Sequence, residues 1–313
     1  MMSWSCFDFG VTGESVRHRR PRARRWVIAL GLAGAWWLAA PPAPAQHGSM
    51  GQMPTPSPLD TAAGAKHLAD FRASRLAGDF CIRFQLVHLP RRGEETRYEG
   101  RAWGTWNEQG PRTRFELWPA TASADGAAAP AGAWTWLVQN GPNPQVWVVA
   151  PGAATARAVP PAEWSKPLFP GLVYAPFDLL MPFIYWPDDE YDGPARVAGR
   201  AADLYLMRPP AAAGTVASPV RIALDREFSA LLRAEQLDAA GQPARRFEVL
   251  SLQKFQGQWM VKTLDLLDWA RHDTDRFTIA AAALRLQLDP EVFDSARLAA
   301  PAPLPAAAAW GAP

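Results

Sequence analysis

The second half of the chain alternates apolar and polar residues with the period of a β-strand. Val220, Ile222 and Leu224 form one apolar face between polar or small neighbours, which is typical of a strand buried on one side. Gly241 and Gly257 lie in short links, where glycine permits the positive φ of tight hairpin turns. The pattern predicts an antiparallel meander of four strands, at residues 220–224, 231–237, 246–255 and 259–267.

The rest of the chain shows the same alternation in shorter stretches. Asp60 is expected to cap a helix that runs to about residue 76. Further strands are expected at residues 80–89, 96–106, 112–118, 134–139, 146–150, 204–207, 276–279 and 284–288. The sequence therefore predicts a mainly β protein of about ten or eleven antiparallel strands with a few helices, in one domain.

Residues 172–187 break this pattern with a dense apolar run. Phe177, Leu180, Met181 and Ile184 have helical spacing, but Pro182 must end or kink a helix. We expect a short apolar helix or turn at residues 176–181. Two interpretations remain open, a plug that completes the core and a mobile lid over a cavity. The acidic residues 188–193 are expected to form a turn before the next strand, because a cation site at such a run is much rarer.

The N-terminal 45 residues are typical of an export signal. Six arginines precede an apolar stretch at residues 26–40, which is too short to span a membrane comfortably. Ala43-Pro44-Ala45 is a small-x-small cleavage site, so we expect cleavage after Ala45 and a periplasmic location. An uncleaved anchor is the alternative, and both the Sec and the twin-arginine routes stay open.

Domain boundaries follow from composition. Residues 1–45 are assigned to the signal peptide and residues 46–58 to a Pro-rich linker. Residues 59–295 are assigned to the β domain, and residues 296–313 to an Ala/Pro-rich tail expected to be disordered.

The charge of the whole chain is misleading because the leader is basic. The chain has 32 basic and 30 acidic residues, and the leader holds six of the basic and two of the acidic ones. The remainder therefore has a net charge of −2, which gives no reason to expect a nucleic-acid partner. Cys6 falls in the leader, so Cys81 is left without an internal disulfide partner. We expect a packed thiol there.

The sequence contains no recognisable catalytic constellation. The five histidines are scattered, at positions 18, 47, 67, 88 and 272, without the spacing of metal ligands. There is no Gly-x-Ser-x-Gly elbow and no Gly-rich phosphate loop. The acidic pairs lie beside turns or in strands, where solvated charge is the usual role. We therefore expect a protein that is not an enzyme, with no catalytic residue, metal site or cofactor.

Several motifs occur in an order that resembles a known family. They include Asp178-Leu179-Leu180-Met181-Pro182-Phe183, Arg196-Val197-Ala198-Gly199-Arg200, Asp225-Arg226-Glu227, Asp238-x-x-Gly241 and Trp259-Met260-x-Lys262-Thr263. Over residues 65–295 the chain resembles the LolA-like outer-membrane lipoprotein-sorting proteins, in a divergent branch whose clients are not assigned. The resemblance implies a half-open antiparallel β-barrel with helices covering its mouth, around an apolar cavity for acyl chains.

The resemblance also implies a function. LolA carries lipoproteins across the periplasm from an inner-membrane transporter to an outer-membrane receptor, so transient membrane contact and two such partners are expected. The primary hypothesis is a periplasmic carrier of lipoprotein acyl chains or another lipid. The alternative is an envelope sensor or regulatory binding protein of the same fold. Oligomeric state stays open.

Alternation assigns the residues that would contact such a lipid. Small residues beside aromatic ones on residues 96–106 leave space or admit close approach, and Gly100, Ala102 and Ala234 are taken to favour a cavity over a filled barrel. The expected lid is Phe177, Leu180, Met181 and Ile184. The expected cavity wall is Phe80, Ile82, Phe84, Tyr98, Trp106, Phe115, Leu232, Phe247 and Val249.

Overall fold

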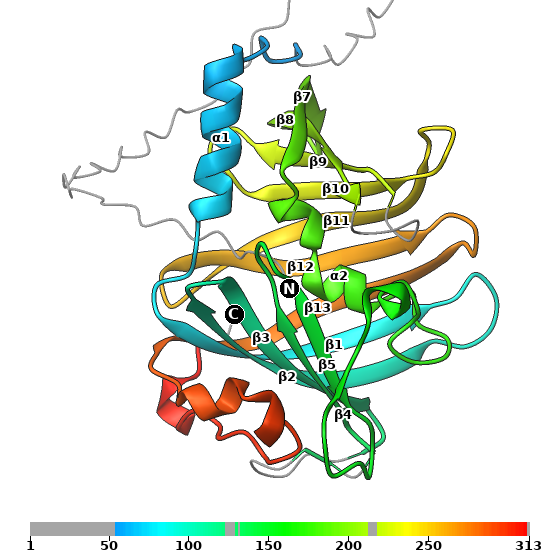
Figure 1. Cartoon of the computed structure of the whole chain (residues 1–313), viewed down its shortest axis with the longest axis vertical. Coiled ribbons are helices and arrows are strands. Elements are labelled where there is room, and N and C mark those ends of the chain that lie inside the picture. The colour runs from blue at the N-terminus through cyan, green and yellow to red at the C-terminus, as the bar shows by residue number, and fades with distance from the viewer. Residues whose placement is uncertain (1–53, 123–128, 131, 212–217, 312–313) are drawn as a thin grey trace, which may run out of the picture. The chain divides into compact units, whose positions relative to one another are not determined.

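A computed structural model describes residues 54–122, 129–130, 132–211 and 218–311. These residues form one curved antiparallel sheet of thirteen strands (Figure 1). The order across the sheet is β6-β5-β4-β3-β2-β1-β13-β12-β11-β10-β9-β8-β7. The strands are β1 (Asp79–Leu89), β2 (Thr96–Asn107), β3 (Gly110–Pro119), β4 (Trp134–Gln139), β5 (Gln145–Val149), β6 (Arg157–Ala158), β7 (Asp188–Val197), β8 (Arg200–Arg208), β9 (Val220–Asp225), β10 (Leu231–Leu237), β11 (Pro243–Phe255), β12 (Gln258–Asp268) and β13 (Asp273–Leu286).

The topology fixes the path of the longest connection. Every pair of neighbouring strands is also adjacent in the sequence, except β1 and β13, which pair in the middle of the sheet. Strands β6 and β7 are consecutive in the chain but lie at opposite edges. Residues 159–187, which join them and which we call the strap, must therefore cross the sheet from edge to edge. The sheet itself stays open between β6 and β7.

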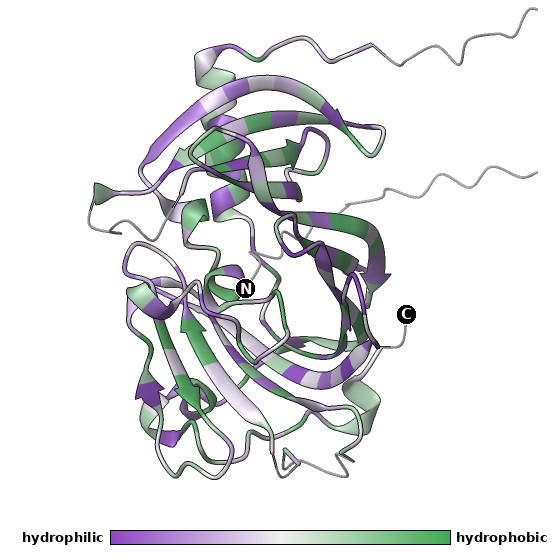
Figure 2. Ribbon diagram, turned by 90° about the vertical axis from the view of Figure 1, so that its right-hand side faces the viewer, coloured by the Kyte–Doolittle hydropathy of each residue, from purple (hydrophilic) through white to green (hydrophobic). Residues whose placement is uncertain are grey.

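The two faces of the sheet carry separate cores. The inner face is the one that bears Ile82 and Phe84 of β1, and its side chains belong to one large cluster that also contains the strap. The outer face bears Cys81 and Trp103, which belong to a second cluster. Figure 2 shows hydrophobic and hydrophilic residues alternating along the curved strands. The period-two pattern of the sequence thus separates the two faces.

Glycines on β2 seat phenylalanine rings rather than leaving a cavity. Gly100 and Gly104 pair across the strands with Phe84 and Phe80. A Cβ added at Gly100 would lie 2.3 Å from the Phe84 ring, and one added at Gly104 would lie 2.1 Å from the Phe80 ring. The small residues therefore allow aromatic rings to lie flat on the backbone. Of the two interpretations of Gly100, close approach is confirmed and empty space is wrong.

Gly100→Ala is expected to destabilise the protein by about 1–3 kcal/mol, the usual cost of overpacking a core. The added methyl would also meet the backbone oxygen of Glu116 at 2.6 Å, which a rotamer change cannot relieve. Chemical denaturation measures the loss. Gly152→Ala would not serve as a control, because a φ of 77° at this position is itself strained for alanine. Ala240→Gly, at the exposed β10–β11 turn, is a suitable one and should change stability by less.

The C-terminal tail packs on the outer face, which differs from the disorder expected for residues 296–313. Residues 288–311 include short 3-10 helices at Pro290–Phe293, Ser295–Arg297 and Ala307–Ala309. The buried indole of Trp103 donates from Nε1 to the Pro303 carbonyl at 2.9 Å. Arg114, paired with Glu116 beneath the tail, donates to the Ala300 carbonyl at 2.6 Å. An Ala/Pro-rich segment is ordered here because its backbone carbonyls accept from buried donors on β2 and β3.

The Cys81 thiol is fully buried in the outer cluster, as a packed thiol should be. Burial raises the pKa of this thiol, and the charges of Arg101 and Glu116 act on it in opposite directions. A thiol held in its neutral form is a poor nucleophile.

Helix α1 (Thr61–Ala73) confirms the helix predicted after Asp60. The Asp60 carboxylate accepts from the Ala63 backbone N–H at 2.8 Å, as an N-cap does. The helix buries Leu68 and Phe71 in the inner cluster.

The turn predicted at the acidic residues 188–193 is wrong, because these residues lie in edge strand β7. All four of the carboxylates in this run are paired with arginines of other elements: Asp189 with Arg72, Asp192 with Arg221, and both Asp188 and Glu190 with Arg208. Charged side chains on an edge strand also oppose pairing with another sheet.

The expected signal peptide lies outside the described residues, as does most of the linker. Within the described residues, no helix has the length and apolar character needed to cross a membrane.

Candidate functional site

The strap supplies most of the material that covers the inner face. It contains a 3-10 turn at Pro161–Glu163, helix α2 (Pro176–Leu180) and a second 3-10 turn at Pro182–Tyr185. Pro176 begins α2, where its missing N–H costs nothing. Met181 ends it with a φ of 46°, and Pro182 prevents continuation. The short helix expected at residues 176–181 is therefore confirmed, and Figure 1 shows it in front of the sheet.

The structure brings together most of the residues expected to contact lipid. All four expected lid residues are buried in the inner cluster; Leu180 and Ile184 are fully buried, and Phe177 and Met181 nearly so. The expected wall residues in the same cluster are Phe80, Ile82, Phe84, Phe115, Phe247 and Val249, with Tyr98 packed against it.

Two of the expected wall residues lie elsewhere. Leu232 belongs to a small separate cluster with Val197, Ala202 and Ala223. The register between β9 and β10 shifts between Leu231 and Arg233, so the alternation reverses there and Leu231 takes the inner position. Trp106 is partly buried near the end of β2 and is in none of the clusters formed by the described residues. Simple alternation placed Leu232 on the wrong face.

The strap packs closely against the inner face. A small cavity of about 20 Å3 lies between the sheet and the strap, lined in part by Phe84, Phe115, Leu168 and Tyr174. That is room for about one water molecule. The strap therefore leaves little free space against this part of the inner face.

A larger pocket opens at the margin of the strap. Its volume is about 380 Å3, within the range of small-molecule sites. It lies between the β4–β5 turn, the strap and the ends of β10 and β11. We call it the mouth pocket; its lining includes Pro144, Trp164, Phe177, Tyr185, Trp186 and Arg245. Proline and aromatic side chains have few rotamers, so such a lining is held in shape.

Polar contacts fasten the strap at several points. Arg245 of β11 donates to both oxygens of Asp178, at 3.1 and 2.8 Å, and to the Val173 carbonyl at 2.6 Å. Burial disfavours the charge of Arg245, but the Asp178 carboxylate outweighs it and raises the pKa of Arg245. A bidentate pair of this kind fixes α2 against the sheet.

A second fastening lies beneath Val173 and Tyr174. Their backbone N–H groups both donate to one oxygen of Asp275, at 2.7 and 2.8 Å. The other oxygen lies 2.6 Å from Nδ1 of His88. Asp275 has no exposed surface, and burial raises the pKa of its carboxyl although these contacts oppose the rise.

Further contacts hold the two ends of the buried section. Arg271 donates to the carbonyls of Gly171 and Leu172, each at 2.9 Å. Arg72 of α1 donates to the carbonyls of Ile184 and Trp186, at 2.7 and 2.9 Å. The strap is thus tied to α1, β11 and the start of β13.

These polar residues were not predicted from the sequence, although their strand positions carry a signal. His88 has the same parity on β1 as Phe84 and Leu86. Arg245 has the parity of Phe247 on β11, and Asp275 that of Phe277 on β13. A titratable residue at an inner-facing strand position must have a partner there. The identity of that partner is set by the strap, which the strand pattern does not reveal.

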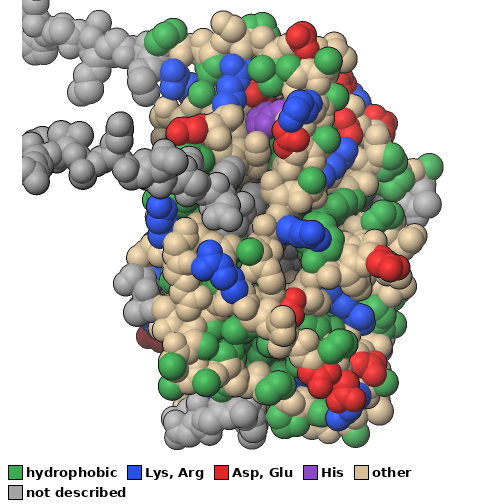
Figure 3. Space-filling view, turned by 90° about the vertical axis from the view of Figure 1, so that its left-hand side faces the viewer, with side chains coloured by type: hydrophobic (Ala, Val, Ile, Leu, Met, Phe, Trp, Pro, Cys, Tyr) green, Lys and Arg blue, Asp and Glu red, His purple; other side chains and the backbone are tan. Residues whose placement is uncertain are grey.

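The described residues do not suggest a metal centre. They contain no group of three or more His, Cys, Asp or Glu side chains able to hold a metal ion. On the face drawn in Figure 3, basic and acidic side chains are interspersed among hydrophobic ones.

Comparison with known proteins identifies the fold. No family model and no curated protein matches the sequence. Among solved structures, a DUF1329 family protein from Desulfovibrio piger is 14% identical, with a TM-score of 0.63 over 76% of this chain and 98% of the other. An outer membrane lipoprotein-sorting protein domain from Vibrio parahaemolyticus is 14% identical, with a TM-score of 0.61 over 74% and 95%. A LolA superfamily protein from Nitrosomonas europaea is 11% identical, with a TM-score of 0.54 over 74% and 96%.

These likenesses extend over nearly the whole of each solved structure, and the sheet is open between β6 and β7 as the sequence resemblance implied. At such low identity the agreement concerns the path of the backbone. The chain therefore has the half-open β fold of the LolA-like proteins.

Proposed function

We propose that this protein is a periplasmic carrier that binds an acyl chain of a lipoprotein or another lipid on the inner face of its sheet. One observation carries the proposal. The apolar inner face is covered by an irregular strap held at discrete polar contacts, and a 380 Å3 aromatic pocket opens beside it. A strap fastened in this way can separate from the sheet without breaking strand pairing.

The energetics suit a carrier. Burial of an acyl chain from water contributes about 0.8 kcal/mol per CH₂, so burial of a chain of about sixteen carbons contributes more than about 10 kcal/mol. A lipid taken from a membrane is already out of water, and the strap must give up its own contacts to the sheet. Net binding is then modest, which allows release. The mouth pocket would admit the end of the chain, and the strap would yield the rest of the space.

A substitution that fills the mouth pocket should weaken binding without unfolding the protein. Ser165 is exposed and lines the pocket, so Ser165→Trp is expected to lower the affinity for a fluorescent fatty acid about tenfold, or about 1.4 kcal/mol. Titration followed by fluorescence measures this. Lys166→Trp places the same indole on the next exposed residue, outside the pocket lining, and should leave affinity unchanged. Equal affinity of both variants would count against the mouth pocket as the entrance.

Transfer separates a carrier from a sensor. Donor vesicles that contain a fluorescently labelled phospholipid are mixed with unlabelled acceptor vesicles, with and without the protein. A carrier accelerates movement of the label between them. A sensor binds the lipid without accelerating transfer and holds a stable protein partner instead. Native mass spectrometry of protein taken from the periplasm should then show lipid bound to a carrier. A protein that binds neither lipid nor probe would contradict both the carrier and the sensor role.

A further inference from the structure

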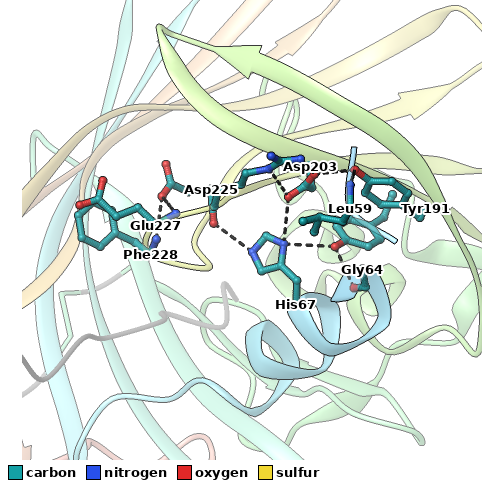
Figure 4. A network of polar contacts seen from close by, with 10 residues as sticks. Leu59, Gly64, His67, Tyr191, Asp203, Asp225, Glu227 and Phe228 are labelled. Carbon is teal, nitrogen blue, oxygen red and sulfur yellow. Dashed lines mark hydrogen bonds and ion pairs between the residues drawn. The ribbon is translucent and has the colours of Figure 1, made fainter. Parts of the chain in front are cut away.

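Helix α1 is docked on strands β7 to β9 through a polar network centred on His67 (Figure 4). The His67 side chain is mostly buried. Its Nε2 lies 3.1 Å from the backbone oxygen of Asp225 at the end of β9. Its Nδ1 lies 3.2 Å from the Tyr205 hydroxyl and 3.4 Å from a carboxylate oxygen of Asp203, both on β8. Both ring nitrogens therefore face groups that can accept a hydrogen bond.

The Tyr205 hydroxyl has only one proton to give. Its oxygen lies 3.0 Å from the carbonyl of Gly64 in α1, which is purely an acceptor. When the hydroxyl donates there, it can only accept from His67. Nδ1 then carries a proton, as does Nε2 facing the Asp225 carbonyl. An imidazole with both nitrogens protonated is the cation, so this set of contacts corresponds to charged His67.

The Asp203 carboxylate beside Nδ1 favours that state. Asp203 binds Arg226 through both of its oxygens and accepts from the Tyr191 hydroxyl of β7 at 2.8 Å. Asp225 binds Arg200, whose other end lies 3.7 Å from Glu227. Glu227 is mostly exposed, so within the buried part of the network Arg226 and Arg200 match Asp203 and Asp225, and His67 adds a second cation to Asp203. Loss of the His67 proton removes the attraction between its ring and the buried Asp203 carboxylate, whose oxygen lies 3.4 Å from Nδ1.

The neutral form would also hold α1 less tightly. A neutral His67 that keeps its Nε2 proton on Asp225 presents a lone pair at Nδ1, toward the Asp203 carboxylate. The Tyr205 proton must then turn from Gly64 to Nδ1, so α1 loses one hydrogen bond and an ion pair together. The other charged pair on the helix, Lys66 with Asp70, is exposed and lies within α1. It does not replace these contacts to the sheet.

Helix α1 in turn holds the end of the strap. Arg72 lies five residues after His67 and donates to the carbonyls of Ile184 and Trp186, and to Asp189. Trp186 lines the mouth pocket. Movement of α1 away from β8 and β9 would withdraw Arg72 and uncover Leu68 and Phe71.

We propose that His67 is a proton switch: its charged form fastens α1 to the sheet and keeps the strap closed, and its neutral form loosens α1 and opens the inner face. The link to lipid access rests on the proposed function, whereas the fastening of α1 does not.

The test uses the whole mature protein and two local measurements. First, nitrogen NMR of 15N-histidine-labelled protein reports the protonation of each ring nitrogen. His67 is expected to show the imidazolium pattern while α1 amides are protected from hydrogen exchange. A neutral tautomer with bare Nδ1 in the docked helix would overturn the proposal.

Second, hydrogen exchange of residues 61–73 is followed from pH 5.5 to pH 8.5 and corrected for the intrinsic rate. Protection is expected to fall at least tenfold across this range, and to be low at every pH in His67→Gln. His272→Asn, at an exposed turn position with a φ of 56°, should keep the wild-type response. The amides of residues 173 and 174 report separately on the His88–Asp275 contact. An unchanged pH response in His67→Gln would overturn the proposal.

The lipid arm is read independently. If the wild-type protein binds fluorescent fatty acid, its association rate should rise with pH and lose that dependence in His67→Gln. If it binds none at any pH, the proposed function fails, while the NMR and exchange results still decide the role of His67.

Discussion

Asp275→Ala should lower the free energy of unfolding by about 3–5 kcal/mol and release the middle of the strap. The alanine leaves two buried backbone N–H groups, those of Val173 and Tyr174, without an acceptor, and each such group costs about 1–3 kcal/mol. His88 loses its partner as well. For a domain of this size the midpoint of thermal unfolding should fall by roughly 10 °C. Amides around residue 173 should exchange faster than those of the central strands.

Asp275→Asn is the matched control for that variant. Its side-chain oxygen can still accept from both amides, and its NH₂ group can donate to Nδ1 of a neutral His88. We expect it to be much less destabilising than Asp275→Ala. Equal losses in the two variants would show that the carboxyl group does not fasten the strap.

The Asp275 carboxyl also predicts that the stability of the protein depends on pH. Burial raises the pKa of Asp275 above its ordinary value of 3.8, so the folded protein holds this proton more tightly than the unfolded chain. The contribution of this proton to stability is complete below pH 3.8 and is lost as the pH rises through the raised value. Denaturation curves between pH 3.5 and pH 7 should therefore show a component that Asp275→Asn removes. A wild-type and an Asn variant with parallel pH profiles would contradict the raised pKa.

Local patterns account for the sheet because strand pairing follows alternation. The alternation of residues 80–86 places Ile82 inward and Cys81 outward, and the structure has them so. Tight turns at Gly241 and Gly257 have the positive φ that their positions require. These features depend on neighbours in the sequence, so the sequence was sufficient to predict them.

Features that depend on distant partners were not predicted. The shift between Leu231 and Arg233 is a property of the pairing with β9, and it moved Leu232 to the other face. The tail looked disordered because its composition is poor in apolar bulk, yet buried Trp103 and Arg114 supply donors to its carbonyls. In both cases the deciding contact joins segments that no local pattern relates.

The candidate site divides in the same way. Helical spacing and Pro182 were enough to locate α2 and its end. The strap's position on the inner face follows from β6 and β7 being opposite edges, which became visible only with the strand order. The polar fastenings follow from that position. Arg245 lies two residues from Phe247, so strand alternation is enough to place its charge on the inner face. Alternation does not identify Asp178 as its partner.

Arg245→Met should destabilise the protein by about 3–5 kcal/mol, because it leaves the Asp178 carboxylate buried without its cation. The Val173 carbonyl loses its donor in the same variant. Asp178→Asn should cost less, since its side-chain oxygen can still accept from the Ala175 N–H at the start of α2. In the double variant no buried charge is left unpaired. The decrease in the free energy of unfolding in the double variant should be smaller than the sum of the two single decreases by about 1–3 kcal/mol. A double-mutant cycle measured by denaturation gives this difference.

The functional consequence distinguishes a fastening from a merely structural ion pair. With Arg245 removed, α2 loses its ion pair to β11, so the strap should open more often and fluorescent fatty acid should associate several-fold faster. Arg97→Met removes an exposed pair with Glu95 and should alter neither stability nor association, because solvated pairs contribute little. A stability loss in Arg245→Met with no change in association rate would mean that lipid does not enter beneath α2.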